Sequence, residues 1–262
     1  MISFGTAASK RLETFDSLWM PPPEKPVLEN DEVHVWLVSI NYEDVTGFEH
    51  IISGDERARA ARFHLSQHKT EYVVSRIHLR KILGNYLAIK PEFIRFEYNE
   101  YGKPAIANKT NSNLKFNFSH SNGFALYAVR LNNEIGVDLE LIQRSHIDDD
   151  VAVKSLTSSE LARFTELPAR ERIEFFYKCW TRKEAYSKAL GKGLIYDPNK
   201  IETLHSFDKP ILESKYNKVF SKTFDSFFID LPAITGFAAG LAVEGSEKTN
   251  LKCWRISSRT LK

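Results

Sequence analysis

Two acidic side chains alternate with apolar ones in the segment Ile135-Gly-Val-Asp-Leu-Glu-Leu-Ile142. In a β-strand, the two-residue period places Asp138 and Glu140 on one face and the apolar side chains on the other. Two neighbouring carboxylates repel each other unless a cation or a proton lies between them. Carboxylate oxygens favour Mg²⁺ over Zn²⁺, and Mg²⁺ commonly combines a few carboxylates with substrate phosphate. The pair indicates either a magnesium site or, as the simpler alternative, a strand edge with its acids in water.

A second charged group lies on a helix predicted over residues 174–190. At about 100° per residue, Glu184 and Lys188 fall on the side opposite the apolar arc that begins at Phe175. They form either an exposed i, i+4 pair, or a third metal-binding carboxylate followed one turn later by an ammonium that neutralises phosphate. Lys183 falls inside the apolar arc, where an unpaired charge would be costly. No role for Lys183 follows from the sequence.

Charge is segregated along the chain, although 36 Lys and Arg residues nearly balance 34 Asp and Glu residues and the net charge is +2. Residues 56–81 contain seven Lys or Arg and two Glu, whereas residues 134–150 contain six acidic residues and one Arg. The two regions could be solvated faces, or they could bind anionic groups at one end and a cation at the other. The second interpretation suits a phosphorylated ligand, because guanidinium groups bind phosphate oxygens through paired hydrogen bonds.

The segment Phe116-Asn-Phe-Ser-His-Ser121 adds hydroxyl groups and the imidazole of His120 after a predicted strand. Adjacent Ser and His residues do not by themselves make a catalytic triad, which requires a third partner and a defined geometry. A plain turn histidine is therefore the alternative interpretation of His120. The sequence contains no Gly-x-Ser-x-Gly elbow, Walker loop or dinucleotide-binding glycine motif.

The elements that must position these residues recur as two similar series. The first series is a strand over 34–40, a Ser-x-x-Glu capping box at 53–56, a helix over 70–87 and a strand over 93–98. The second is a Thr-x-x-Glu box at 157–160, the helix over 174–190 and a short strand over 199–204, at offsets of 104, 103 and 108 residues. Two late strands are expected over 223–231 and 234–243. This order predicts an α+β fold with antiparallel sheets and packed helices.

The chain divides into three predicted parts. Residues 1–30 form an arm, because the segment Pro21-Pro-Pro-Glu-Lys-Pro26 cannot enter a helix or a central strand. Residues 31–130 form an N-terminal α+β half. Residues 131–262 form a C-terminal α+β half that carries the metal site.

Composition limits the class of protein. The 262 residues, 42% of them hydrophobic and 12% aromatic, are enough for one large folded domain or two packed halves. No apolar run approaches the roughly 20 residues of a membrane helix, and the N-terminus lacks the pattern of a signal peptide. Two cysteines exclude a disulfide scaffold and a multi-cysteine zinc site. The charge balance argues against an obligate DNA coat, so we expect a cytoplasmic protein without nucleic-acid or membrane partners.

Three segments resemble the signatures of Sfp-type 4′-phosphopantetheinyl transferases. They are the segment 116–121 quoted above, Gly136-Val-Asp-Leu-Glu140, and Trp180-x-x-Lys-Glu-Ala-x-x-Lys-x-x-Gly-x-Gly-Leu194. The third is the most specific, and the similarity extends from Ser53 to Leu204. The resemblance implies two similar α+β halves related by pseudo-twofold symmetry, each an antiparallel sheet packed with helices.

The resemblance also implies an activity. Members transfer the 4′-phosphopantetheine arm of coenzyme A to a serine of an apo carrier protein and release adenosine 3′,5′-bisphosphate, with Mg²⁺ as cofactor. The carrier belongs to the acyl, peptidyl or polyketide type. We expect the chain to act as a monomer, since both halves lie in one chain.

The matching positions imply roles for individual residues. Asp138, Glu140 and Glu184 would hold Mg²⁺ against the pyrophosphate of CoA. Glu184 and Lys188 are the predicted catalytic residues: Lys188 contacts phosphate, and Glu184 takes the serine proton directly or through a metal-bound water. The predicted CoA-binding residues are Arg59, Arg62, Tyr101, Gly102, Lys103, Asn117, Ser119, His120, Asp138, Glu184 and Lys188.

One position departs from the pattern of the family. Glu56 stands where some members carry Lys. Binding of the 3′-phosphate or adenine end of CoA is therefore expected to depend more on Arg59 and Arg62.

Other function classes remain open at this point. A different Mg²⁺-dependent phosphoryl or nucleotidyl transferase could use the same acids, although no glycine loop that cradles phosphate precedes a helix. A catalytically silent module that binds CoA or a carrier protein would be expected to have lost an acid or Lys188, yet all are present. A nucleic-acid binder would account only for the basic stretch.

Overall fold

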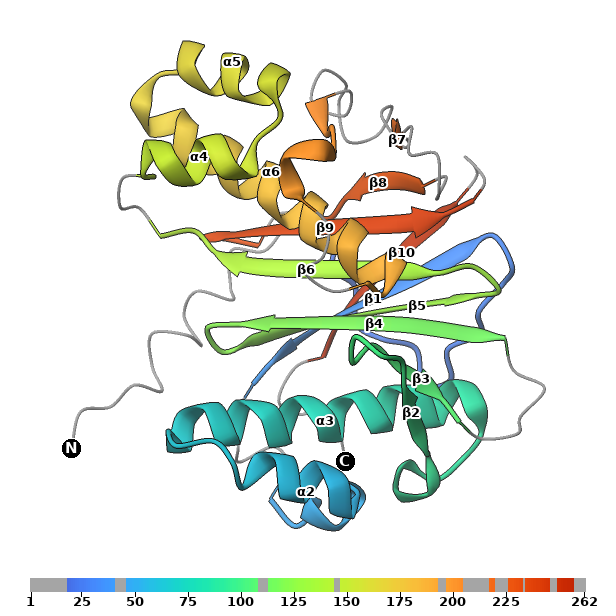
Figure 1. Ribbon diagram of the computed structural model, residues 1–262. Helices are drawn as coiled ribbons and strands as arrows, with labels where there is room; N and C mark the ends of the chain where they lie inside the picture. The colour runs from blue at the N-terminus through green and yellow to red at the C-terminus, as the bar shows by residue number, and fades with distance from the viewer. Residues whose placement is uncertain are drawn as a thin grey trace.

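A computed structural model describes residues 18–40, 46–107, 113–143, 147–192, 197–204, 217–219, 226–232, 234–245 and 249–256. Figure 1 shows two sheets lying between two long helices. Most of the predicted N-terminal arm, and Gly193 and Leu194 of the third motif, lie outside the described residues. Within the described ranges no helix is both long and apolar enough to cross a membrane.

The first sheet has the strand order β10-β1-β5-β4. Its strands are β1 (Glu32–Ser39), β4 (Leu114–Ser121), β5 (Phe124–Leu131) and β10 (Asn250–Ile256). The pairs β1–β5 and β5–β4 are antiparallel, whereas β1 and β10 run parallel. A short antiparallel hairpin, β2 (Phe96–Tyr98) with β3 (Pro104–Ile106), lies beside this sheet.

The second sheet has the strand order β6-β9-β8-β7, and all its described pairs are antiparallel. Its strands are β6 (Ile135–Leu141), β7 (Asn217–Val219), β8 (Ser226–Asp230) and β9 (Phe237–Glu244). The order β6-β9-β8 repeats the order β1-β5-β4 of the first sheet, which confirms the predicted α+β fold with two similar halves.

Helices cover the outer faces of the two sheets (Figure 1). They are α2 (Gly54–Ala60), α3 (Ser66–Leu87), α4 (Asp149–Ser155), α5 (Ser158–Glu166), α6 (Ala169–Leu190) and the 3₁₀ turns η3 (Glu49–Ile51), η4 (Pro91–Phe93) and η6 (Pro198–Lys200). Both α3 and α6 have 22 residues, and α6 begins 103 residues after α3. Both predicted capping boxes are confirmed, at Ser53 before α2 and at Thr157 before α5.

The core follows the same layers. A central cluster joins the facing sides of the two sheets, with Val35 of β1, Val137 of β6 and Leu241 of β9 among its members. Further apolar clusters lie between the first sheet and α3, and between the second sheet and α6. The strand period predicted for β6 is therefore confirmed: its apolar residues enter the central core, and its other face is turned toward α6.

The structure corrects two of the expected strands. The strand over 199–204 is wrong: the chain forms η6 there, because Asp197 and Pro198 start a 3₁₀ turn and the backbone amide of Thr203 then donates to Glu160 rather than to a neighbouring strand. The strand over 93–98 begins only at Phe96, because Pro91 starts η4.

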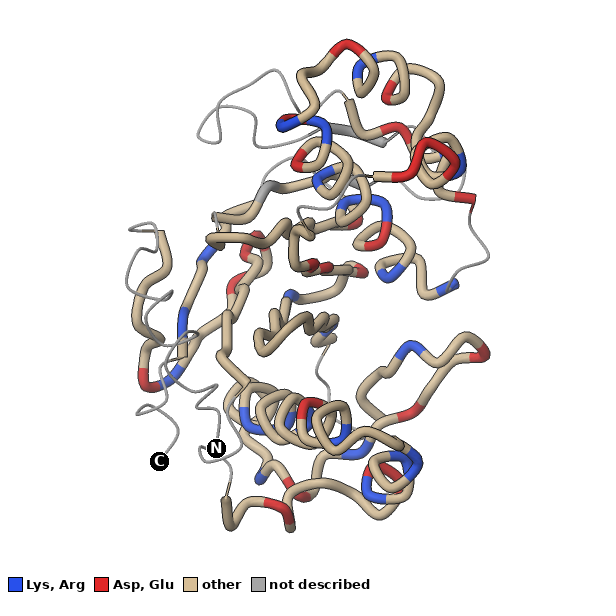
Figure 2. Tube along the Cα trace, turned by 90° about the vertical axis from the view of Figure 1, so that its left-hand side faces the viewer, with Lys and Arg blue, Asp and Glu red and all other residues tan. Residues whose placement is uncertain are grey.

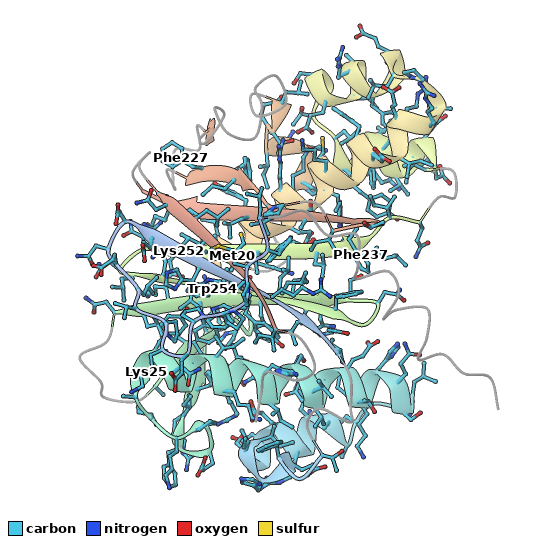
Figure 3. The ribbon with its side chains drawn as sticks, turned by 180° about the vertical axis from the view of Figure 1, so that it is seen from behind. Met20, Lys25, Phe227, Phe237, Lys252 and Trp254 are labelled. Atoms are coloured by element: carbon cyan, nitrogen blue, oxygen red, sulfur yellow. The ribbon has the colours of Figure 1, made fainter. Side chains whose placement is uncertain are left out.

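The chain end adds a strand that the sequence did not indicate. The strand β10 belongs to the sequence range of the predicted second half but pairs with β1 in the first sheet. Met20 lies beside β10 (Figure 3), its amide donating to the carbonyl oxygen of Cys253 at 3.0 Å. The division at 1–30, 31–130 and 131–262 therefore remains a prediction, and the last strand crosses it.

Candidate active site

Two glycines let α6 pack directly on the second sheet. A Cβ atom on Gly136 would lie 1.9 Å from the carbonyl oxygen of Ala185, and one on Gly240 would lie 2.6 Å from the carbonyl group of Thr181. Only glycine allows backbones to approach this closely. Asp138 pairs with Gly240 across β6 and β9, so the close approach places α6 over Asp138.

Asp138 is the centre of the candidate site and is 2% exposed. Its Oδ1 accepts hydrogen bonds from Lys188 Nζ at 2.6 Å and Ser119 Oγ at 2.9 Å. Its Oδ2 is buried and has no hydrogen-bond partner within the described part of the chain. A buried carboxylate oxygen without a partner is costly, and a bound cation would satisfy it.

Two further carboxylates lie against Asp138. Burial, and then the charges of Asp138 and Glu184, raise the pKa of Glu140 to about 7, although the ammonium of Lys188 opposes them. Burial and the charge of Asp138 likewise raise the pKa of Glu184, again against Lys188. Burial is the largest cause of both shifts, and the charge of Asp138 adds to each of them. The contact of Lys188 with Asp138 is observed, whereas one cation shared by Asp138, Glu140 and Glu184 remains a prediction.

Side chains of β4 connect the first half to β6. Asn117 Oδ1 accepts a hydrogen bond from the amide of Val137 at 2.9 Å, and Ser121 Oγ accepts one from the amide of Leu141 at 3.1 Å. Ser119, between them, donates to Asp138. These bonds replace backbone pairing between β4 and β6, and they put the acidic cluster at the junction of the two halves.

His120 lies at the end of β4, next to this junction. The residue is exposed by area, yet enough protein surrounds its imidazole to lower its pKa, and the charges of Lys188 and His68 add to this effect against that of Glu71. Along β4, the side chains of Asn117, Ser119 and Ser121 face β6, so that of His120 lies on the other face, with Phe116 and Phe118 on the side of α3. A contact of His120 with phosphate stays a prediction.

The predicted residues of the β2–β3 turn lie at the C-terminal end of α6. Lys103 Nζ donates to Glu134 at 2.6 Å and to the carbonyl oxygen of Ala189 at 2.7 Å. Gly102 has a positive φ of 83°, which the tight turn requires, and Tyr101 is exposed. A groove of about 560 Å³, which Lys103 and Gly191 line, lies between this hairpin, β4 and α6.

The two predicted arginines are not part of the acidic cluster. Arg59 is exposed on α2, with its guanidinium 5.7 Å from the ring centre of Tyr72, and Arg62 is exposed just after this helix. Figure 1 places α2 outside α3, in the layer farthest from α6. Figure 2 shows basic positions along these lower helices and a group of acidic positions near the centre of the molecule.

Comparison with known proteins identifies the family. The model of the 4′-phosphopantetheinyl transferase superfamily matches residues 134–240, and the model of the 4′-phosphopantetheinyl transferase N-terminal region matches residues 24–132. The 4′-phosphopantetheinyl transferase HetI of Nostoc sp. is 35% identical over 179 residues, which are 67% of this chain and 76% of HetI. The chain belongs to the 4′-phosphopantetheinyl transferase family.

Other members of the family match in part. Sfp of Bacillus subtilis is 26% identical over 59% of this chain and 67% of its own length, which supports the Sfp type. The rat L-aminoadipate-semialdehyde dehydrogenase-phosphopantetheinyl transferase is 23% identical over 78% of this chain and 62% of its own length. The solved Thermotoga maritima holo-(acyl-carrier-protein) synthase covers 43% of this chain and 63% of its own, with 20% identity and a TM-score of 0.30, too low to support an argument.

The carboxylates of this transferase are suitable ligands for a hard divalent cation, but they do not have the arrangement of a metal site. No group of three or more His, Cys, Asp or Glu side chains among the described residues is arranged to hold a metal ion. Instead, the ammonium of Lys188 lies on Oδ1 of Asp138. The unpartnered Oδ2 and the repulsion felt by Glu140 and Glu184 are what a cation would relieve.

Sequence reasoning missed two residues that the site needs. Gly136 and Gly240 control how near α6 comes to the acids. Gly136 begins the second family motif but received no role from the sequence, and the only sequence signal of Gly240 is a small residue within a strand. Glu56, which we read as a departure in the ligand pocket, is instead 2% exposed and paired with Arg76 and Arg80. Its role in this structure is to hold α2 against α3.

Proposed function

We propose that this 4′-phosphopantetheinyl transferase uses coenzyme A as the donor and Mg²⁺ as the cofactor, at the cluster of Asp138, Glu140, Glu184 and Lys188. The observation that carries the proposal is the buried, unpartnered Oδ2 of Asp138 beside two acids with raised pKa values. The three carboxylates would hold Mg²⁺, which supplies neutralisation of the pyrophosphate charge when bound.

Lys188 is proposed to stabilise the charge that develops at the attacked phosphorus. Its ammonium already donates to Asp138 Oδ1, at the centre of the acidic cluster, and to Ser119 Oγ beside it. An ammonium has three donors, so a phosphate oxygen can be bound by the third. A cation held in place before substrate arrives acts without reorganisation during the reaction.

Glu184 is proposed to accept the proton of the attacking serine hydroxyl, directly or through a water molecule. Its raised pKa makes the carboxylate a better proton acceptor than an exposed glutamate. A bound cation would oppose this effect by lowering the proton affinity of its ligands, which favours the route through water.

The rest of the coenzyme is proposed to extend from the acids along β4. Ser119, His120 and the backbone around Asn117 lie at one end of this path, and the groove lined by Lys103 lies beside it. Arg59 and Arg62 are proposed to receive the 3′-phosphate. The acceptor is an apo acyl, peptidyl or polyketide carrier protein, and we propose that the chain acts on it as a cytoplasmic monomer without nucleic-acid or membrane partners.

The test is intact-mass analysis of apo carrier proteins incubated with the chain, CoA and Mg²⁺. We expect one carrier to gain one phosphopantetheine, and we expect no gain in EDTA or with Glu184→Gln. Lys188→Ala should lower the rate by about 10²–10³-fold, since it removes one group that stabilises developing charge. The matched control is Asn85→Ala, at the corresponding place in α3, which should leave the rate unchanged. Normal transfer by Glu184→Gln would remove this residue from the mechanism.

A further inference from the structure

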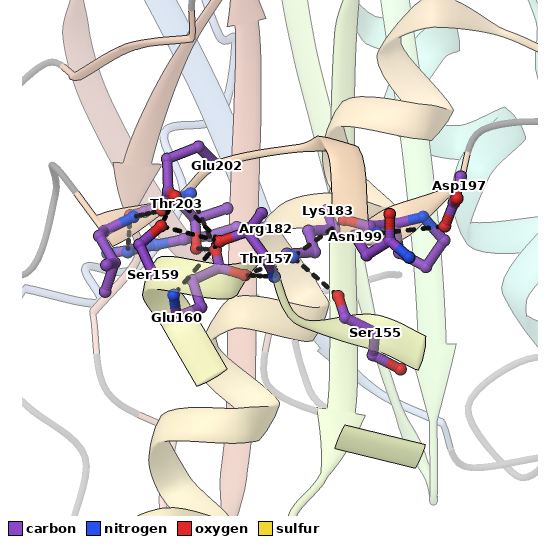
Figure 4. Close-up of polar contacts among 12 residues, drawn as sticks. Ser155, Thr157, Ser159, Glu160, Arg182, Lys183, Asp197, Asn199, Glu202 and Thr203 are labelled. Atoms are coloured by element: carbon purple, nitrogen blue, oxygen red, sulfur yellow. Dashed lines mark hydrogen bonds and ion pairs between the residues drawn. The ribbon is translucent and has the colours of Figure 1, made fainter. Parts of the chain in front are cut away.

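A buried ion pair joins α6 to the helices that precede it (Figure 4). Lys183 Nζ lies 2.5 Å from Glu160 Oε2 and also donates to the carbonyl oxygens of Ser155 at 2.8 Å and Pro198 at 2.9 Å. Lys183 is 1% exposed and Glu160 is fully buried. All three donors of the ammonium are used within the protein, so Lys183 has none left for a substrate.

Glu160 extends this contact to two more segments. Its Oε2 accepts the amide of Thr157 at 2.9 Å, which closes the capping box of α5. Its Oε1 accepts the amide of Thr203 at 2.9 Å and the hydroxyl of the same residue at 2.5 Å. One carboxylate therefore holds the start of α5, the segment after η6 and the middle of α6 together.

Lys183 directly precedes Glu184, so the ion pair acts where the site is built. Neighbouring residues on an α-helix point about 100° apart, which turns Glu184 toward β6 while Lys183 points to α5. On the sheet side, α6 is supported by the glycine contacts at Gly136 and Gly240.

We infer that Lys183 is a positioning residue: its ion pair with Glu160 fixes the rotation of α6 so that Glu184 and Lys188 stay over Asp138. The inference rests on the proposed function of the acidic cluster. The network touches neither CoA nor the reacting atoms, so its effect is exerted through the helix. Partners of this kind commonly change metal affinity or activity by 10–100-fold when they are removed.

The first half contains a similar buried ion pair, but no acid follows its cation in the long helix. Arg80 lies 103 residues before Lys183 and is 1% exposed. Its Nε donates to Glu56 Oε2 at 2.8 Å, and its Nη1 donates to the carbonyl oxygens of Pro91 and Ile94, each at 2.9 Å. The residue that follows Arg80 is Lys81, not an acid. Arg80 thus offers a control for the loss of a buried cation from a long helix.

The experiment compares Lys183→Met with Arg80→Met in the full-length chain. Binding of Mn²⁺ in the presence of CoA is followed by electron paramagnetic resonance, and kcat is measured at saturating CoA and carrier protein. Lys183→Met should weaken Mn²⁺ binding about tenfold or more and lower kcat in parallel, while Arg80→Met should leave the Mn²⁺ affinity unchanged. Should Lys183→Met fail to fold, Glu160→Gln replaces it, because Gln at this position can still close the capping box.

The outcomes separate the two proposals. Equal Mn²⁺ affinity and equal kcat for the Lys183 and Arg80 variants would overturn the positioning role and leave the proposed function intact. The same holds if Glu160→Gln behaves like wild type. A wild-type protein that binds no Mn²⁺ and modifies no carrier would instead overturn the proposed function, and the positioning role with it.

Discussion

The two halves of the molecule share a topology but differ in what lies between the sheet and the long helix. In the first half, β1 presents Trp36 and Val38 to α3, where they pack with Leu79 and Leu83. In the second half, the corresponding face of β6 presents Asp138 and Glu140 to α6. The same scaffold is thus closed by apolar packing in one half, whereas the other half carries acids at the corresponding place, of which Asp138 pairs with Lys188. The proposed function accounts for this difference, because it assigns the acids to a bound cation.

The buried ion pairs show the opposite pattern, because both halves have one. Glu56 with Arg80 and Glu160 with Lys183 each join a capped short helix to the long helix behind it. Both carboxylates close capping boxes and both cations also bind backbone carbonyl groups. Because both halves have such an ion pair, we regard the pair as part of the shared scaffold. In the second half the acidic residue Glu184 directly follows the buried cation, Lys183.

The largest stability effect should come from breaking these ion pairs. Glu160→Ala leaves the buried Lys183 without its carboxylate, and Glu56→Ala leaves both Arg76 and Arg80 without theirs. Each loss should cost about 3–5 kcal/mol. Equilibrium unfolding in urea should give losses of similar size in the two halves. Glu166→Ala is the control, since this glutamate pairs with Arg163 at 3.8 Å on the surface, where such a pair contributes less than about 1 kcal/mol.

A large loss for only one of the two variants would break the parallel between the halves. If Glu56→Ala resembled the surface control while Glu160→Ala did not, the ion pair of the first half would not be part of the scaffold. Arg80→Met would then be unsuitable as a control for Lys183→Met.

Local patterns were enough to predict most of the fold. Capping boxes and helical spacing indicated the short and long helices of both halves, and alternation placed Asp138 and Glu140 on one face of β6. These features depend on residues a few positions apart. The pairing of β1 with β10 joins Glu32 to Asn250, and no local pattern carries information about contacts over such a separation.

The candidate site likewise contains residues that the sequence could predict and others that it could not. The acids and Lys188 could be predicted because their types and spacing form motifs. The role of Lys183 could not, since its partners Ser155, Glu160 and Pro198 come from three other elements. Burial of the ammonium within the apolar side was visible in the sequence, but the partners that offset its cost became visible only in three dimensions.

The next largest effect is expected from disturbing the close packing of α6 on β6. In Gly136→Ala the new Cβ atom would lie 1.9 Å from the carbonyl oxygen of Ala185, so α6 must shift. We expect a loss of about 2–3 kcal/mol in unfolding free energy, typical of overpacking, together with a clear loss of transfer. Urea unfolding and the carrier assay measure the two effects on the same samples.

The control for this variant is Gly54→Ala, at a helical glycine with no atom within 4 Å of the added Cβ. It should leave the unfolding free energy unchanged or slightly higher. Full activity of Gly136→Ala would show that transfer does not depend on the close approach of α6 to β6. The two halves would then differ only in the side chains that lie between sheet and helix.

The smallest expected effect is the pH dependence of stability that Glu140 contributes in the second half. The pKa of Glu140 rises from 4.5 to about 7 on folding, so the folded state holds this proton more tightly than the unfolded state does. The contribution of Glu140 to stability is therefore complete below pH 4.5 and is lost as the pH rises through 7. Because the side chain is partly exposed, we expect a loss of about 1–2 kcal/mol across this interval, less than the whole shift would give.

Comparison of wild type with Glu140→Gln isolates this contribution, because the amide does not titrate. The stability difference between them, measured by urea unfolding without metal, should move in favour of Glu140→Gln from pH 4.5 to pH 7. Added Mg²⁺ should reverse this trend in wild type alone, since a cation stabilises the ionised carboxylates. Parallel pH curves would mean that burial and the neighbouring acids do not raise the pKa of Glu140 in solution, and this difference between the halves would be lost.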